Sequence, residues 1–278
     1  MSERPAVTVP EILSRKGAEK ITVLTAYDAP TARLLDRAGI DILLVGDSVE
    51  MAVYGQASTL TATMDVLVRH SRAVSAAARR ALVVGDMPFL SYQVSPGAAV
   101  GNAGRFLAQG GCAAVKVEGG RRVLPSIEAI LAADIPVMGH LGLTPQSFRK
   151  LGGYKVQGRS KSAAEGILED ARALEEAGCF ALVLECVPSA LAAEVTASVS
   201  IPTIGIGAGP QCDGQVLVFH DLVGLSGEFR PRFVRRYADL ASEIEKAAKA
   251  YAEDVRAGRF PAESESFAGE APPLRRVY

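Results

Sequence analysis

The chain alternates between short apolar runs and longer amphipathic stretches over most of its length. The runs are rich in Val, Ile and Leu and almost free of polar residues, which is typical of strands buried on both faces of a parallel sheet. They predict strands over residues 21–26, 41–46, 81–85, 113–117, 135–139, 180–185 and 202–206. Residues 215–218 are a candidate for an eighth strand, although their periodicity suits a helix nearly as well.

Helical patterns fill the segments between these runs, and several end at a glycine such as Gly39 or Gly178, the residue favoured after a helix. Strict alternation of strand and helix predicts a parallel sheet with right-handed crossovers. We predict a single (β/α)8 TIM barrel, because polar residues end several runs and barrels place function at many strand ends. An open sheet would concentrate it at one switch point.

The 278 residues, 49% of them hydrophobic, suffice for one large core. We expect an N-terminal extension over residues 1–20, the catalytic barrel over 21–260, and a polar, proline-containing tail over 261–278 that is poorly ordered. Residues 232–259 form one long helical pattern, which either covers the barrel or packs against another subunit.

The charge is nearly balanced, with 30 basic and 31 acidic residues, so no overall field favours nucleic acid or an anionic membrane. No signal-peptide pattern and no run near the roughly 18 to 20 apolar residues of a membrane span occurs. We therefore expect a cytoplasmic protein whose partners are small molecules or copies of itself. Four widely spaced cysteines predict buried reduced thiols rather than a disulfide or a zinc site.

Three acidic residues stand at the ends of consecutive predicted strands. Asp47, Asp86 and Glu118 follow the second, third and fourth runs, so a parallel barrel would make them neighbours on one rim. Oxygen ligands without Cys or a His pair favour Mg²⁺ or a similar ion. The alternative for each residue is a helix cap or a solvated loop position.

Three further residues are candidates for chemistry. Lys116 shares the strand face of Glu118, and its burial would require an anionic partner, either a substrate or a structural carboxylate. Glu185 ends an apolar run that would desolvate it and raise its pKa, as proton transfer requires; alternatively, backbone amides hold it. His140 would orient substrate or assist proton transfer, or is merely structural.

Two long loops, over residues 47–63 and 141–160, are candidate lids. The second carries Lys150, Lys155 and Arg159, whose charge suits an anionic substrate, although packed structural loops are an equal alternative. The glycines of residues 205–209 lack the dinucleotide-binding spacing, and no serine-hydrolase, P-loop or zinc-protease motif occurs. The remaining hypothesis is metal-assisted chemistry on a small anionic substrate.

The same residues lie in a series of motifs that resembles one enzyme family. The motifs are LLVGDS at 43–48, DMPF at 86–89, VKVEGG at 115–120, GHLGLTPQS at 139–147, GGYKVQGR at 152–159, LECVP at 184–188 and IGIGAG at 204–209. In this order, over about residues 21–258, the chain resembles the ketopantoate hydroxymethyltransferases.

The resemblance implies a barrel of the phosphoenolpyruvate/pyruvate type and a homodecamer of two pentameric rings. It implies transfer of a hydroxymethyl group from 5,10-methylenetetrahydrofolate, a co-substrate, to 3-methyl-2-oxobutanoate in pantothenate and coenzyme A biosynthesis. The rivals are a carbon–carbon lyase or phosphonate mutase of the same superfamily, which would not use folate, and a non-catalytic metabolite-binding barrel.

The resemblance also implies roles for individual residues. Asp47 and Asp86 would hold Mg²⁺ with Glu118 in the metal site, and Glu185 would be the proton acceptor. The predicted substrate-binding set is Asp47, Ser48, Asp86, Lys116 and His140. The family commonly reads VGDSLGM and then a GH pair, whereas this chain has Glu50 and Gln56, both in the loop after the second predicted strand.

Overall fold

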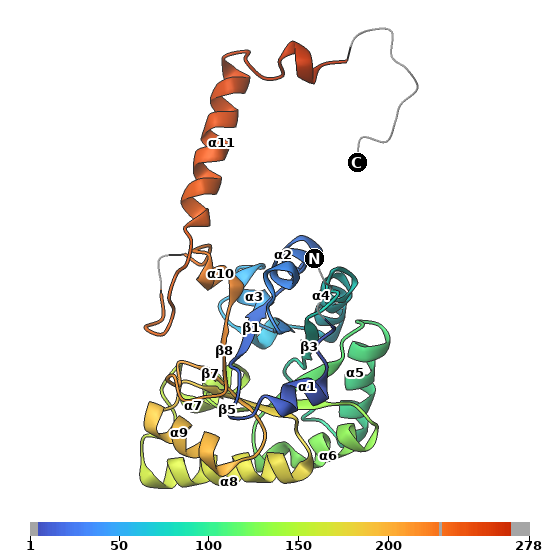
Figure 1. Cartoon of the computed structure of the whole chain (residues 1–278), viewed down its shortest axis with the longest axis vertical. Helices are drawn as coiled ribbons and strands as arrows, with labels where there is room; N and C mark the ends of the chain where they lie inside the picture. Colours follow the sequence, from blue (N-terminus) through green and yellow to red (C-terminus); the bar gives the residue numbers. More distant parts are fainter. Residues whose placement is uncertain (1–4, 228–229, 268–278) are drawn as a thin grey trace.

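A computed structural model describes residues 5–227 and 230–267, and its centre is a closed barrel of eight parallel strands in chain order (Figure 1). The strands are β1 Ile21–Thr25, β2 Ile42–Val45, β3 Leu82–Asp86, β4 Ala114–Glu118, β5 Val137–Gly142, β6 Ala181–Glu185, β7 Thr203–Ile206 and β8 Gly214–Leu217. Strand β8 pairs with β7 and with β1, so the ambiguous segment is the strand that closes the barrel. The predicted (β/α)8 fold is confirmed.

Most of the helices lie around the barrel (Figure 1), and the 3-10 turns η1 to η3 lie in its loops. The helices are α1 Val9–Ser14, α2 Ala29–Ala38, α3 Val49–Ala52, α4 Met64–Ala77, α5 Pro96–Ala108, α6 Leu124–Ala132, α7 Phe148–Leu151, α8 Lys161–Ala177, α9 Ser189–Ser198, α10 Phe219–Leu222 and α11 Leu240–Arg256. The turns are η1 Thr59–Thr61, η2 Arg121–Val123, η3 Pro145–Ser147 and η4 Glu263–Glu265. As predicted, α2 and α8 end at Gly39 and Gly178, both left-handed.

The strands bury both faces, which explains their unbroken apolar runs. The outward-facing side chains of the strands pack against the surrounding helices. Inward-facing residues such as Ile42, Val84 and Met138 form a second cluster inside the barrel. Ile12 of α1 and Val7 belong to this inner cluster, so the N-terminal segment closes the lower end of the barrel. Because side chains repeat with period two, the next inward positions above this cluster carry the polar residues of the rim.

Two buried aspartates secure the N-terminal segment to the base of the barrel. Asp41 Oδ1 lies 3.0 Å from both Arg15 Nη1 and Arg80 Nη2. Asp213 Oδ2 lies 3.0 Å from Lys16 Nζ, and Asp213 Oδ1 accepts a hydrogen bond from the backbone N–H of Gly17. The N-terminal segment is therefore held by charge as well as by apolar packing.

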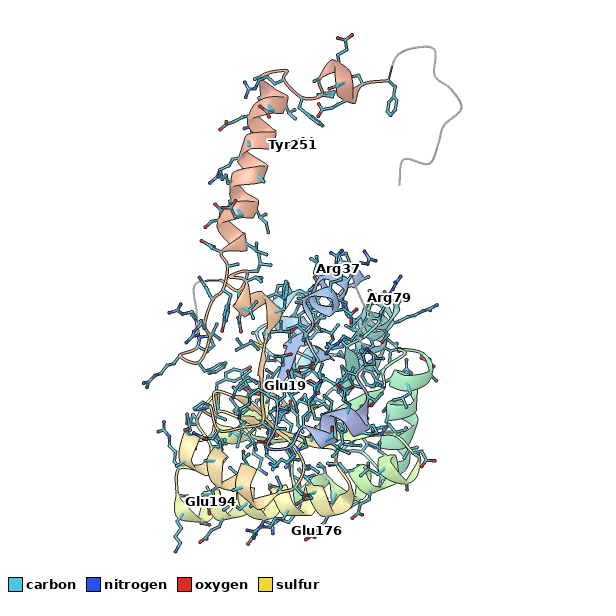
Figure 2. The ribbon with its side chains drawn as sticks, viewed as in Figure 1. Glu19, Arg37, Arg79, Glu176, Glu194 and Tyr251 are labelled. Carbon is cyan, nitrogen blue, oxygen red and sulfur yellow. The ribbon has the colours of Figure 1, made fainter. Side chains whose placement is uncertain are left out.

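The predicted helix over residues 232–259 is wrong in its first third, because α11 begins only at Leu240. Backbone hydrogen bonds from Tyr237 to Leu222 and from Leu240 to Val223 hold the preceding segment against the end of α10, and Asp239 caps α11. The helix buries none of its residues and extends away from the barrel (Figures 1 and 2). Of the two alternatives for this segment, covering the barrel is therefore wrong, and packing against another subunit stays a prediction.

Three further observations concern the tail, the cysteines and the helices. Of the tail expected to be poorly ordered, residues 268–278 lie outside the described part, and η4 forms just before them. All four cysteines are free; three are buried, as predicted, and Cys186 is half-buried. Among the described residues, no helix has the length and apolarity that crossing a membrane requires.

Candidate active site

Three carboxylates meet at the C-terminal rim of the barrel, as the strand ends predicted. Asp86 and Glu118 are the last residues of β3 and β4, and Asp47 follows β2 by two residues. One oxygen of each lies within 4.8 Å of an oxygen of both others, and all three side chains are buried. Parallel strands end on the same rim, which is why residues far apart in the chain converge here.

Lys116 lies among these carboxylates. Its Nζ is 2.7 Å from Asp86 Oδ1 and 3.5 Å from Glu118 Oε1. Burial lowers the pKa of Lys116, but the charges of Asp86, Glu118 and Asp47 outweigh it and hold the pKa above its usual value. Lys116 is therefore a buried cation that balances part of the negative charge.

One lysine does not compensate three carboxylates. Burial, then the charges of Asp86 and Glu118, raise the pKa of Asp47 well above its usual value. Burial also raises the pKa of Asp86 against the opposing effect of Lys116. Burial raises the pKa of Glu118 too, but Lys116 and the hydrogen bond with His140 outweigh it, so this pKa is lowered. The surplus of negative charge and the all-oxygen donor set fit a divalent cation of the Mg²⁺ type.

His140 joins this cluster to Glu185. On one side His140 Nδ1 lies 3.1 Å from Lys116 Nζ, and on the other His140 Nε2 lies 3.3 Å from Glu185 Oε2. Burial and Lys116 lower the pKa of His140, but hydrogen bonds with Glu118 and Glu185 outweigh both and raise it to about 9. His140 therefore lies between the carboxylate cluster and Glu185, rather than apart from them.

Glu185 ends β6 across the rim, and 16% of its side chain is exposed. The Asp86, Lys116, Glu118 and His140 side chains are exposed by only 1–4%. The apolar run therefore does not desolvate Glu185 completely, because part of the side chain stays in contact with solvent. A ligand above the rim can reach it.

Ser48 has a buried partner that the sequence did not indicate. Its Oγ lies 2.8 Å from Oη of Tyr27, which follows β1. Burial raises the pKa of Tyr27 above its usual value, so the phenol stays protonated near neutral pH. Tyr27 could not be recognised in advance, because nothing in an apolar run followed by tyrosine distinguishes a core residue from a site residue.

Gln146 is the second residue that sequence reasoning missed, although it lies within the motif at 139–147. Its Nε2 donates to Asp47 Oδ2 (3.1 Å), and its backbone N–H donates to Glu118 Oε2 (3.1 Å). Tyr92 Oη donates to Gln146 Oε1 (2.8 Å). The only advance signal was an amide beside a proline in a loop after a strand end.

The two long loops meet over the rim. In the loop after β5, the rings of Phe148 and Tyr154 stack at 5.6 Å, and Tyr154 Oη lies 3.9 Å from the sulfur of Met51 in the loop after β2. Glu50 is buried within that loop and accepts a hydrogen bond from Thr61 Oγ1 (2.7 Å). In the described part of the chain, no ion pair links the three basic residues of the β5 loop to the carboxylates of the rim.

This chain has the (β/α)8 barrel fold, with ionisable groups from five neighbouring strands gathered at its C-terminal rim, and several solved enzyme structures share that fold. The solved structure of phosphoenolpyruvate phosphomutase from Streptomyces platensis subsp. rosaceus matches with a TM-score of 0.61 at 16% identity, covering 94% of this chain and 92% of that one. A 2,3-dimethylmalate lyase described as a member of the PEP mutase/isocitrate lyase superfamily matches with a TM-score of 0.60 at 18% identity, covering 95% and 90%. At these identities the likeness establishes the fold alone.

Sequence comparison narrows the barrel fold to one family. The family model described as ketopantoate hydroxymethyltransferase matches residues 6–263. A 3-methyl-2-oxobutanoate hydroxymethyltransferase from Moorella thermoacetica is 56% identical over 268 residues, covering 96% of this chain and all of that protein. One from Oleidesulfovibrio alaskensis is 53% identical, covering 96% and 92%. The chain belongs to the ketopantoate hydroxymethyltransferase family, and the predicted resemblance is confirmed.

Proposed function

We propose that this enzyme transfers a hydroxymethyl group from 5,10-methylenetetrahydrofolate to 3-methyl-2-oxobutanoate, giving 2-dehydropantoate and tetrahydrofolate in pantothenate biosynthesis. The observation that carries the proposal is the meeting of Asp47, Asp86 and Glu118 within 4.8 Å at the barrel rim, with Glu185 close by, in a chain of this family. The identity of the one-carbon donor rests on the family resemblance.

The carboxylates supply the metal site of this proposal. Asp47 and Asp86 would bind Mg²⁺ directly, and Glu118 would bind it directly or through water, since Mg²⁺ usually keeps several waters and takes one or two carboxylates. When bound, Mg²⁺ polarises the 2-oxo group of the substrate and stabilises negative charge on its oxygen.

The neighbouring residues bind and orient the substrate anion. Lys116 would pair with the carboxylate of 3-methyl-2-oxobutanoate, since its ammonium group lies beside the proposed metal ligands Asp86 and Glu118, whose negative charge a bound cation would offset. The Ser48 hydroxyl is oriented by Tyr27 and offers a hydrogen bond to the same anion. The loops after β2 and β5 would limit the access of water.

Glu185 is the proton acceptor in this proposal. Its partly exposed carboxylate would take the proton from C3 of the oxo acid, and His140, 3.3 Å away, would hold the carboxylate in place. The carbanion then forms the new carbon–carbon bond to the methylene carbon of the folate, and one of the two carbon–nitrogen bonds of that methylene group breaks. Water cleaves the second carbon–nitrogen bond, supplies the hydroxyl oxygen of 2-dehydropantoate and releases tetrahydrofolate with its two nitrogens protonated.

The rival functions are less well supported. The lyases and mutases share the fold at 16–18% identity, whereas relatives above 50% identity carry the transferase name. Decameric assembly and a cytoplasmic location stay predictions, the first from the resemblance and the second from the absence of a signal pattern.

Proton NMR of 3-methyl-2-oxobutanoate in D₂O, with the protein and Mg²⁺ but no folate, tests the proposal. The C3 proton signal should disappear, and EDTA or Glu185→Gln should stop the exchange. Glu194→Gln is the matched control, since this exposed carboxylate lies on the outer helix α9 (Figure 2).

Exchange that persists in both EDTA and Glu185→Gln would contradict the assigned metal and base. In a second assay, adding 5,10-methylenetetrahydrofolate to the wild-type enzyme with Mg²⁺ and 3-methyl-2-oxobutanoate should yield 2-dehydropantoate. Proton exchange without that product would favour a lyase or mutase.

A further inference from the structure

We propose that Gln146 is a positioning residue that assembles the metal-binding carboxylates from the β5 loop, with Tyr92 setting the orientation of its amide. The inference deepens the proposed function, because it concerns the same carboxylates.

Gln146 links two of the three carboxylates. Its side-chain Nε2 donates to Asp47 Oδ2 (3.1 Å), and its backbone N–H donates to Glu118 Oε2 (3.1 Å). These carboxylates come from strands β2 and β4, which are not adjacent in the barrel. A single buried residue in η3 therefore sets the spacing between ligands that the sheet does not pair directly.

The hydrogen bonds around the amide fix which end faces Asp47. Tyr92 Oη lies 2.8 Å from Gln146 Oε1, and Gln93 Nε2 donates to the same oxygen at 3.3 Å. The second proton of Gln146 Nε2 goes to the backbone oxygen of Met87 (2.9 Å). Tyr92 Oη also lies 3.0 Å from the backbone oxygen of Glu118, so its one proton has two possible acceptors. A flipped amide would place Oε1 against the carboxylate of Asp47 and the carbonyl of Met87, both of which are acceptors, so the observed orientation is the one that satisfies these groups.

The amide of Gln146 orients the carboxylate of Asp47, as hydrogen-bonding groups around metal ligands commonly do. Gln146 occupies Oδ2 and leaves the other oxygen of Asp47 as a ligand in a fixed direction. Loss of such a partner typically costs about 10- to 100-fold in metal affinity. Gln146 does not contact the proton acceptor Glu185 in the described residues, so it acts through the metal site rather than on the reacting carbon.

The position of Gln146 also couples a loop to the site. Turn η3 belongs to the β5 loop, and it packs against η1 of the β2 loop. Displacement of η3 would remove both hydrogen bonds to the carboxylates at once. The metal site is therefore complete only with this loop in place.

The test measures Mn²⁺ binding in the absence of substrate. The free ion is quantified from its electron paramagnetic resonance signal. Gln146→Met keeps the size of the side chain but has no donor, and it should weaken Mn²⁺ binding about 10- to 100-fold. Tyr92→Phe removes only the phenolic oxygen and should weaken binding in the same direction by less. Gln109→Met, at an exposed position after α5, should bind as the wild type does.

Thermal unfolding in EDTA separates positioning from simple support. The inference would be overturned if the folded variants Gln146→Met and Tyr92→Phe bind Mn²⁺ within about twofold of the wild-type affinity and differ from the wild type only in a lower unfolding temperature. If Gln146→Met does not fold, Tyr92→Phe decides by the same criterion. A wild type that does not bind Mn²⁺ would overturn the metal site itself, which distinguishes that failure from this one.

Discussion

Replacement of Asp41 by asparagine should destabilise the fold strongly without touching the rim. The two oxygens of Asp41 face different donors: Oδ1 accepts from Arg15 and Arg80, while Oδ2 accepts from the backbone N–H and hydroxyl of Thr22. An asparagine must turn its NH₂ group toward one of these pairs. Turned toward the arginines, the NH₂ group loses two charge-assisted hydrogen bonds; turned toward Thr22, it loses the bond from the backbone N–H. In either orientation the negative charge beside Arg15 and Arg80 is gone.

Each lost bond costs about 1–3 kcal/mol in a buried setting, so we expect Asp41→Asn to lower the free energy of unfolding by about 2–5 kcal/mol at pH 7. Asp65→Asn is the matched control, because it also removes an arginine partner but at a side chain that is 81% exposed. It should cost no more than about 1 kcal/mol.

The effect should depend on pH. Burial raises the pKa of Asp41, but hydrogen bonds from Thr22, Arg80 and Arg15 outweigh it and lower the pKa below its usual value. A lowered pKa in the folded state gives stability that is present above the unfolded pKa of about 3.9 and is lost as pH falls through the folded pKa. The difference between wild type and Asp41→Asn should therefore be full at pH 7 and shrink below about pH 4.

Urea unfolding followed by circular dichroism, at one protein concentration and in EDTA, measures both quantities. A loss below about 1 kcal/mol at pH 7, or one equal to that of Asp65→Asn, would refute the reasoning. So would a difference that grows as the pH falls.

Three further predictions concern the rim. Lys116→Met should weaken 3-methyl-2-oxobutanoate binding at least about 10-fold, because the desolvated charge pair between the lysine and the substrate carboxylate is lost. Calorimetry measures the affinity, and an unchanged value would show that the lysine is only structural. Tyr27→Phe should raise the KM for the oxo acid about 2- to 10-fold through Ser48, at similar Mn²⁺ affinity. Gly142→Ala should slow C3 proton exchange, because its Cβ would lie 2.2 Å from the backbone oxygen of Glu185 at a φ of 90°; unchanged exchange would contradict this.

Most of the fold follows from the apolar pattern, and its failures have local causes. Strand β8 was ambiguous because Gln215 is exposed between buried Gly214 and Val216, so the run is interrupted. The helix over residues 232–259 was predicted too long because its first residues follow a helical period, yet hydrogen bonds to the end of α10 hold them in another conformation. Tertiary contacts overrode local periodicity there.

The charged residues of the candidate site follow from the strand pattern, whereas its neutral residues do not; Ser48 was found only through the family resemblance. Asp47, Asp86 and Glu118 stand out because a carboxylate is costly beside a buried strand unless it has a purpose. Gln146 and Tyr27 carry no charge, and their position depends on the path of a loop or on side-chain packing. Such residues become visible only when the partners they contact are known.

The barrel interior has consequences for how such enzymes diverge. On β3, Leu82 and Val84 belong to the dry inner cluster, whereas Asp86, roughly 7 Å further along the strand, belongs to the charged rim. Substitutions in the upper layer can alter the reaction while the lower layer keeps its packing. Evolution can thus exchange one chemistry for another without designing a new scaffold, in keeping with a barrel shared by mutases and lyases at 16–18% identity.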